Sequence, residues 1–375
     1  HGPSTEQDRW EENAGYSPFT LAVEISALLC GADLADLAEQ KVFANYLRDT
    51  ADDWNASVEQ FTYATGTDLA GRIGVDGYYV RVGSSNANDA AAPTRAMVPV
   101  KNRAGEHATI SASDLVSTDA LALVRFGLRD ANDPRMLNTV KVIDAMLRSE
   151  TNTGPTWLRY NEDGYGEHPD GSPFDGTGVG RGWPLLAGER AHYEIAAGNT
   201  DEAIRLAAVM RAQASSGAFL PEQVWNAADI PERELFNGEA TGSAMPLVWA
   251  HAEYVKLLRS LHEGRMFDCP PQTHARYLKE QNVPRVTAWR ASRAVKVMPV
   301  GRVLRVDANE QVSVHWSADN WVTTSDTQSM QIAPNLYVVE LPTAALEVGA
   351  EVKLTLYWPD QLKWQGQDYV VTVVE

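Results

Sequence analysis

Apolar residues recur at helical spacing through most of the chain from residue 17 to residue 264. They return every three or four positions with polar residues between them, which is the pattern of amphipathic helices. The clearest start signal is Asp133 followed by Pro134, a capping residue ahead of a proline at the first helical position. The pattern predicts helices at Leu21–Leu29 (ending near Gly31), Asp36–Val58, Asp119–Leu128, Pro134–Arg148, Trp183–Ala197, Asp201–Ala214 and Gly242–His262.

The connections between these helices include one long irregular segment. Thr151–Gly182 is rich in Gly, Pro and Asp, and long ordered loops in compact domains are usually functional. Only Tyr78–Val82 in this part of the chain reads as a short strand. Helical hairpins that follow one another, with functional loops between them, indicate a mainly α repeat toroid rather than an α/β sheet.

The pattern changes to alternation at Pro284. Short alternating runs bounded by Gly, Pro and Asp predict a small all-β sandwich at residues 284–375, after a helical domain at residues 1–283. Four tryptophans of this region are either an exposed ligand-binding platform or part of the core, because a half-buried strand hides every second residue. They are Trp316, Trp321, Trp358 and Trp364.

Composition excludes several classes of partner. The 375 residues contain 50 acidic and 32 basic side chains, a formal net charge of −18, which argues against binding to nucleic acid or to an anionic membrane surface. No apolar run of membrane-spanning length and no signal peptide are evident. The eight histidines are scattered without zinc-ligand spacing, so no metal and no cofactor is predicted. Cys30 and Cys269 are either two thiols or one disulfide.

Two short stretches carry candidate acid–base chemistry. In the first, Trp10 is followed by Glu11 and Glu12, and a carboxyl held beside an indole is partly desolvated and suited to donate a proton. The alternative is a solvated acidic turn before a helix, with Ser17 as the N-cap and Pro18 at the first helical position.

The second stretch pairs another carboxylate with another indole, Glu222 with Trp225. Glycoside hydrolysis needs two carboxyl groups flanking the scissile bond, one to protonate the leaving oxygen and one to activate water or to attack. Sugars also stack their C–H faces on indole rings. The chain holds eleven tryptophans, which suits carbohydrate contact, although tryptophan also fills cores.

Four motifs in order resemble the catalytic half of bacterial glucoamylases and glucodextranases of glycoside hydrolase family 15. The resemblance runs from residue 1 to about residue 280. It implies an (α/α)6 barrel and an enzyme that inverts the anomeric centre, with Glu11 as general acid and Glu222 as general base. The motifs are Asp8–Glu12, Arg159–Gly166, Gly180–Arg190 and Pro221–Trp225.

The resemblance also suggests residues that bind substrate. Glu12 and Arg159 match positions that hold the neighbouring sugar unit, the alternative being a structural salt bridge. Trp10, Trp183 and Trp249 match aromatic residues of the site wall, although Trp249 could equally lie in the core.

Five further residues lie within these motifs. Glu162 and Asp163 are expected to orient Arg159, and Asp8 to support Glu11. Glu189 and Arg190 either contact sugar or brace the barrel as an ion pair.

The resemblance is incomplete in one respect. A family barrel has twelve helices, and the pattern predicts only seven or so from residue 17 to residue 264. We therefore expect that the first helices of the toroid are missing and that the N-terminal part of the same enzyme is a partner. The alternative to an active enzyme is a truncated glucan-binding or structural fragment without activity of its own.

The predicted activity is exo-acting release of β-glucose from the non-reducing ends of α-glucans. Glucoamylase action on α-1,4 linkages and glucodextranase action on α-1,6 linkages both stay open, as does trehalose hydrolysis. The resemblance favours a secreted or periplasmic location.

Overall fold

The computed structural model describes residues 2–86, 92–103 and 109–375. Its contacts divide the chain into two compact units. The first unit comprises His1–Ser26 and Ser57–Gln281, and the second comprises Ala27–Ala56 and Asn282–Glu375. Helices α1 (Pro18–Leu37) and α2 (Lys41–Thr62) each give residues to both units.

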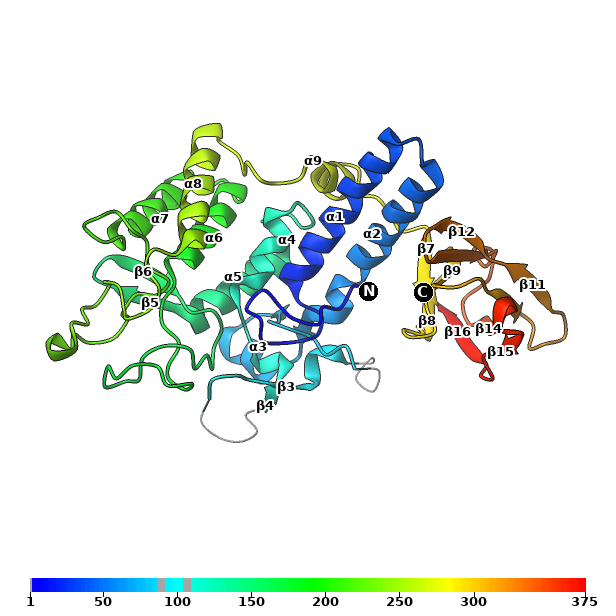
Figure 1. Ribbon diagram of the computed structural model, residues 1–375, viewed down its shortest axis with the longest axis horizontal. Coiled ribbons are helices and arrows are strands. Elements are labelled where there is room, and N and C mark those ends of the chain that lie inside the picture. Colours follow the sequence, from blue (N-terminus) through cyan, green and yellow to red (C-terminus); the bar gives the residue numbers. More distant parts are fainter. Residues whose placement is uncertain (1, 87–91, 104–108) are drawn as a thin grey trace. The chain divides into compact units, whose positions relative to one another are not determined.

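Three packed helices form the centre of the first unit. Helix α6 (Pro184–Ala196) packs against α7 (Thr200–Ala212) and α8 (Val248–Glu263), and Figure 1 shows the three side by side. The close approach requires glycine on α6, because a Cβ at Gly188 would lie 2.7 Å from Glu253 Cγ and 2.9 Å from Met210 Sδ.

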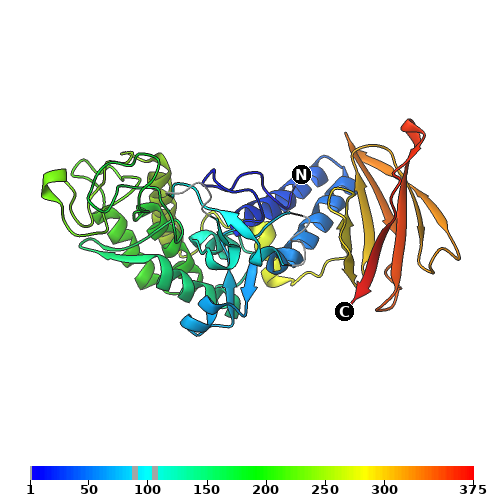
Figure 2. The same cartoon turned by 90° about the horizontal axis from the view of Figure 1, so that it is seen from below.

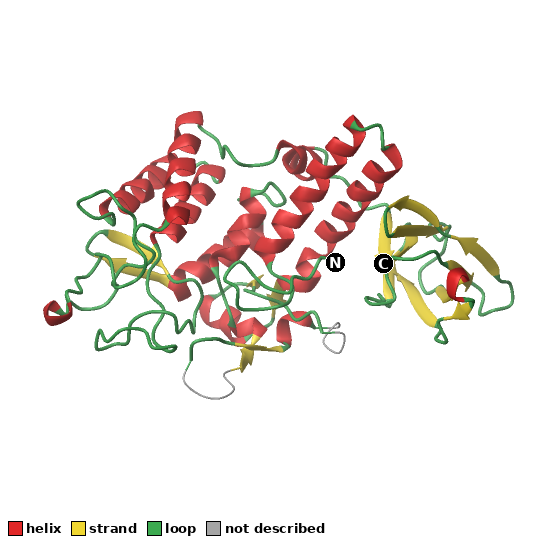
Figure 3. Cartoon of the chain, in the orientation of Figure 1, coloured by secondary structure: helices red, strands yellow, loops and turns green. Residues whose placement is uncertain are grey.

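Apart from the 14-residue helix α5, the remaining elements of the first unit are short, and irregular segments connect them (Figure 3). β5 and β6 form a hairpin, as do β3 with β4 and β1 with β2. The helices are α3 (Asp68–Ile73), α4 (Leu121–Arg125), α5 (Pro134–Leu147) and α9 (Pro271–Thr273). The strands are β1 (Tyr63–Thr65), β2 (Gly77–Tyr79), β3 (Met97–Pro99), β4 (Thr109–Ser111), β5 (Arg148–Thr151) and β6 (Gly154–Trp157).

Helix capping follows the sequence signals. The Asp133 side chain accepts a hydrogen bond from the backbone N–H of Arg135 at the start of α5, as predicted. Ser17 precedes Pro18 at the start of α1, and its Oγ lies 3.5 Å from the backbone nitrogen of Thr20.

Three predicted helix boundaries are wrong. The second helix, α2, begins at Lys41 and not at Asp36, which lies in α1. Helix α1 does not end near Gly31 but continues to Leu37, because Gly31 faces Leu47 of α2 across a close helix–helix contact. Helix α8 begins at Val248 and not at Gly242, because the backbone before it pairs with the loop that carries Glu222.

Helix α1 is also long and apolar enough to cross a membrane by length and composition, contrary to the sequence expectation. This is weak evidence for a membrane segment. Leu21, Ile25 and Leu29 on its apolar side are fully or almost fully buried, as in the core helix of a globular unit.

The second unit contains two sheets that share one core. A six-stranded sheet has the order β11-β10-β14-β16-β8 with β15 on β14, and a four-stranded sheet has the order β12-β13-β9-β7. Buried side chains of both sheets meet in a single cluster, and Figure 2 shows the strands of this unit running alongside one another. The strands are β7 (Val286–Trp289), β8 (Val297–Pro299), β9 (Val303–Ala308), β10 (Ser313–Ser317), β11 (Ser325–Gln328), β12 (Met330–Ala333), β13 (Leu336–Leu341), β14 (Glu351–Trp358), β15 (Lys363–Trp364) and β16 (Tyr369–Val374).

Residues 27–56 belong to the second unit, although the sequence places them with the helical domain. The reason is a buried polar contact between α2 and β9. Arg305 Nη2 donates to Thr50 Oγ1 at 2.8 Å, Arg305 Nε donates to Asp307 at 2.8 Å, and the Tyr46 hydroxyl donates to Asp307 at 3.1 Å. Arg305 and Asp307 lie in an alternating strand pattern, and that pattern does not reveal that they contact a helix far away in the sequence.

Candidate active site

The segment that carries Glu11 is a tight turn held at both ends. Thr5 and Gly15 exchange backbone hydrogen bonds of 2.9 and 3.0 Å, which close the loop between them. A Cβ at Gly15 would lie 2.4 Å from the carbonyl oxygen of Gly83, so only glycine allows this closure. Glu11 is thus presented from a pinned loop rather than from a frayed end.

Asp8 shapes the turn from within. One oxygen of its buried carboxylate accepts backbone hydrogen bonds from Trp10 at 3.2 Å and Glu12 at 3.0 Å. Glu11 adopts a left-handed backbone conformation with φ of 59°, which directs its side chain away from the turn. Its carboxylate is exposed, so the predicted desolvation beside an indole is not found.

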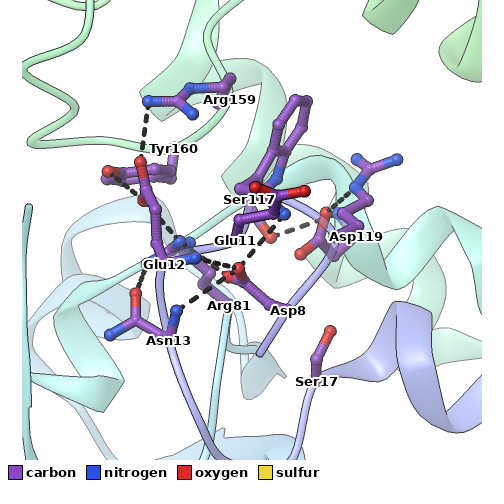
Figure 4. Close-up of polar contacts among 12 residues, drawn as sticks. Asp8, Glu11, Glu12, Asn13, Ser17, Arg81, Ser117, Asp119, Arg159 and Tyr160 are labelled. Carbon is purple, nitrogen blue, oxygen red and sulfur yellow. Dashed lines mark hydrogen bonds and ion pairs between the residues drawn. The ribbon is translucent and has the colours of Figure 1, made fainter. Parts of the chain in front are cut away.

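Arg81 fixes this turn to the rest of the unit, and the sequence analysis missed it. Its fully buried guanidinium pairs with Asp8 at 2.8 Å and Glu12 at 2.9 Å, donates to Asn13, and lies 3.9 Å from the ring centre of Tyr160 (Figure 4). The only signal for it is an arginine within the apolar run Tyr78–Val82, where a buried cation needs anionic partners.

The carboxylate of Glu12 is engaged on both oxygens. Oε2 accepts from Arg81 and from the Tyr160 hydroxyl at 2.6 Å, and Oε1 lies 3.1 Å from Arg159 Nη2. The salt bridge between Glu12 and Arg159, which was the alternative to sugar binding, is therefore present (Figure 4). A contact of either residue with sugar stays a prediction.

Arg159 links the Glu12 turn to the aromatic side chains. Asp163 receives two of its hydrogen bonds, at 2.8 and 2.7 Å, and so orients the guanidinium as predicted. Burial lowers the pKa of Arg159, but Asp163 and Glu12 raise it more, so its charge is secure. Glu162 does not orient Arg159: it forms a surface pair with Arg103 at 2.8 Å.

The predicted wall tryptophans form one aromatic cluster. Trp10 lies 5.2 Å from Trp183 and 5.3 Å from Trp249 between ring centres, and Arg159 lies over both Trp10 and Trp183. Trp249 is 37% exposed, so it is not a core residue. Among the described residues, the buried indole nitrogens of Trp10 and Trp183 have no hydrogen-bond partner. A cluster with unused donors suits a polar ligand.

A second ion-pair group supports Trp10. Arg9 lies 4.6 Å from the ring centre of Trp10, pairs with Asp119 at 2.7 Å and donates to Glu189 at 3.1 Å. Burial raises the pKa of Asp119. Arg190 pairs instead with Asp144 and Glu194. Glu189 and Arg190 therefore both brace helices, but with other partners rather than with each other.

The loop carrying Glu222 reaches the same cluster through Tyr165. The hydroxyl of Tyr165 hydrogen-bonds to the Glu222 carboxylate, and the ring of Tyr165 lies 4.8 Å from the Arg159 guanidinium carbon and 6.4 Å from the Trp183 ring. The loop is held by a backbone bond from Glu222 to Ala244 of 2.8 Å and by Gln223 Nε2, which donates to the Tyr165 carbonyl at 2.9 Å.

Glu222 is half-buried, and its electrostatic surroundings favour proton uptake. Burial raises the pKa of Glu222, whereas the Tyr165 hydrogen bond and the charge of Arg159 act in the opposite direction without cancelling it. Burial and Glu222 together raise the pKa of Tyr165 to about 12, so this hydroxyl stays a donor. Among the described residues, Glu222 Oε1 is buried without a hydrogen-bond partner.

The structure thus joins most of the predicted site residues. Contacts run from Glu12 through Arg159 to Trp10 and Trp183, and through Tyr165 to Glu222. Glu11 projects from the turn next to Glu12, and Figure 4 shows both beside Asp8. Tyr165 is the second member that the sequence analysis did not single out, although it lies within the motif Arg159–Gly166.

Two carboxylates, one half-buried and one exposed, together with a cluster of indoles are compatible with a carbohydrate-processing type of site. Residues 1–259 match Glycosyl hydrolases family 15, and the chain belongs to this family. The motif-based resemblance is therefore confirmed.

Two relatives show the extent of the similarity. The chain is 37% identical over 277 residues to a glucoamylase of Clostridium sp. (strain G0005), covering 74% of this chain and 36% of that protein. It is also similar to the crystal structure of a bacterial glucoamylase complexed with acarbose, with a TM-score of 0.66, 37% identity, and coverage of 74% of this chain and 38% of that one. The chain thus spans little more than a third of the length of either relative.

Proposed function

We propose that this chain carries the acid–base pair of an exo-acting, inverting glycoside hydrolase that releases β-glucose from non-reducing ends of α-glucans. The observation that carries the proposal is Glu222. Its half-buried carboxylate has a raised pKa and one oxygen without a partner among the described residues, and it lies in the contact network of Arg159 and Trp183.

In this proposal Glu222 is the general base. A carboxylate with a raised pKa is a better proton acceptor, provided that the pH lies above that pKa. Glu222 Oε1 is buried and has no hydrogen-bond partner among the described residues, so the protein leaves its lone pairs unused. Water then attacks the anomeric carbon as Glu222 takes its proton.

Glu11 is the general acid that protonates the leaving glycosidic oxygen. Its exposed carboxylate on a rigid turn is open to a substrate, and a glucan seated over it would supply the desolvation that the free chain lacks. We predict a separation of about 6.5–9.5 Å between the two carboxyl groups, with room for the attacking water.

The remaining residues of the network would hold the sugar units. The relative complexed with acarbose supports a glucan-type substrate, and the buried indole nitrogens of Trp10 and Trp183 have no hydrogen-bond partner among the described residues. Trp249 offers an exposed ring face, and Glu12 with Arg159 offers charge-assisted hydrogen bonds.

One observation favours the alternative, a glucan-binding fragment without activity on its own. The proposed acid is exposed, and the chain spans little more than a third of its relatives. If a wall over Glu11 is needed to seat the leaving group, this chain would bind glucan without cleaving it.

The test is the product released from starch, dextran and trehalose, followed by proton NMR during the first turnovers. The proposal expects β-glucose to appear before mutarotation, and the preferred polymer distinguishes α-1,4 from α-1,6 action. If α-glucose appears first, the enzyme retains configuration and the base role of Glu222 is wrong. If glucan binds and no glucose appears, the fragment alternative is supported.

A further inference from the structure

The six-stranded sheet of the second unit has an outer face that carries aromatic rings. On β10 and β14 the side chains alternate, and Val314, Leu354 and Leu356 point into the core. His315 and Tyr357, one position away from these, therefore lie on the outer face. The register places His315 opposite Thr355, and Tyr357 opposite Trp364 of β15.

Four rings on this face form a continuous set, named here the aromatic strip. Trp321 stacks on His315 with ring centres 5.5 Å apart and an angle of 11° between planes. Trp364 meets His315 edge-on at 5.9 Å and lies 5.1 Å from Tyr357. The strip thus runs Trp321, His315, Trp364, Tyr357.

The other two tryptophans of this region differ in direction. Trp316 and Trp358 alternate inward and pack against the core cluster. Trp364, by contrast, is 49% exposed. The sequence left open whether these tryptophans lie in the core or on an exposed surface. Trp316 and Trp358 belong to the core, and Trp364 belongs to an exposed aromatic surface.

Polar groups at the strip provide directional contacts. His315 Nδ1 lies 2.8 Å from Asp326 Oδ1, so a polar imidazole and a carboxylate border the indole rings. The Trp364 indole, whose side chain is half exposed, adds a donor.

We propose that the aromatic strip binds an α-glucan chain by stacking sugar rings on Trp321 and Trp364. A pyranose ring has an apolar C–H face and a rim of hydroxyl groups, which matches the half-exposed ring of Trp364 and the partly buried ring of Trp321 with polar groups beside them. The ligand is uncharged, so the net charge of −18, which disfavours anionic polymers, does not oppose it. The choice of an α-glucan rests on the proposed function.

The test is retention of the full chain on insoluble starch granules and in native gels containing soluble starch, dextran or cellulose derivative. The chain is compared with Trp321→Ala/Trp364→Ala, which removes the two ring faces and leaves the catalytic network unchanged. The matched control is Val322→Ala/Leu362→Ala. These neighbours are each 82% exposed and carry no ring.

We expect the tryptophan double variant to lose about tenfold or more in apparent affinity for α-glucan. The control variant should bind as the parent does, and both variants should melt at the parental temperature. Retention that does not change in the tryptophan variant overturns the proposal, as does retention by cellulose derivative alone or by none of the polymers.

Hydrolysis of maltose distinguishes the two proposals. A chain that binds granules through the tryptophans and releases no glucose supports the aromatic strip and contradicts the proposed activity. A chain that releases glucose and binds granules equally with or without the tryptophans supports the proposed activity and contradicts the aromatic strip.

Discussion

The Glu11 turn and the Glu222 loop place their carboxylates in opposite surroundings. Glu11 is exposed to solvent on a turn that the buried ion pair of Asp8 with Arg81 supports. Glu222 is half-buried, and only Tyr165 hydrogen-bonds to its side chain among the described residues. The protein thus supports Glu11 rigidly, whereas it adjusts the proton affinity of Glu222.

The difference has a chemical meaning if the two residues act as acid and base. A base benefits from partial burial because its proton affinity rises, and it needs to be set before substrate arrives. An acid that donates to the leaving oxygen can be desolvated by the substrate itself. What the protein must fix in advance is the position of Glu11, and the buried ion pairs beneath it do so.

The strongest way to break this comparison is Glu222→Gln. The amide cannot accept a proton, so hydrolysis of starch, dextran and α-glucosyl fluoride should all fall by about 10² to 10⁴. Initial rates of glucose release measure the loss. Parental rates on any of the three substrates would mean that the base lies elsewhere.

Glu11→Gln should separate the two roles by leaving group. Starch leaves as a poor alkoxide and needs the proton, so its cleavage should fall by about 10² to 10⁴, whereas fluoride leaves without help and its release should stay within about tenfold of the parent. Fluoride-electrode and glucose assays on one preparation compare the two. An equal fall on both substrates would remove the acid assignment.

Arg81→Met tests the support beneath Glu11. It leaves the carboxylates of Asp8 and Glu12 buried with fewer cationic partners, and breaking a buried pair in this way costs about 3–5 kcal/mol of unfolding free energy. Urea titration followed by tryptophan fluorescence measures the change.

The matched control is Arg205→Met, which breaks an exposed pair with Glu202 and should cost about 0–1 kcal/mol. If the two variants lose the same small amount, the turn does not depend on Arg81.

The sequence motifs predicted the candidate substrate-binding residues better than the buried residues that hold them in place. Glu12, Arg159 and the three wall tryptophans were recognised because their order along the chain is itself a signal, and the structure joins them in one network. Arg81 was missed, because a single arginine in a short apolar run does not reveal which distant carboxylates neutralise it.

The fold was predictable where periodicity is local and not where a partner is distant. The α5 cap needed only Asp133 and its neighbours. The grouping of residues 27–56 with the β region depends on Arg305 meeting Thr50, a contact between residues far apart in sequence. The closed toroid implied by the resemblance stays a prediction.

The smallest expected effect concerns Tyr165→Phe, and it tests the tuning of Glu222 without removing it. The Tyr165 hydrogen bond lowers the pKa of Glu222 from the higher value that burial alone would set. Without the hydroxyl, the pKa of Glu222 should rise further. A base works only when ionised, so activity lost as the pH falls through this pKa should now be lost at a higher pH.

The measurement is the acidic limb of the profile of kcat/KM against pH, which reports the free enzyme. We expect the limb of Tyr165→Phe to move to higher pH, with the rate at the plateau changing little. Tyr193→Phe is the matched control, because its hydroxyl donates to the carbonyl of Ala131 and does not contact Glu222. A limb that stays in place in Tyr165→Phe, or moves equally in both variants, would show that Glu222 is not the group whose ionisation limits activity.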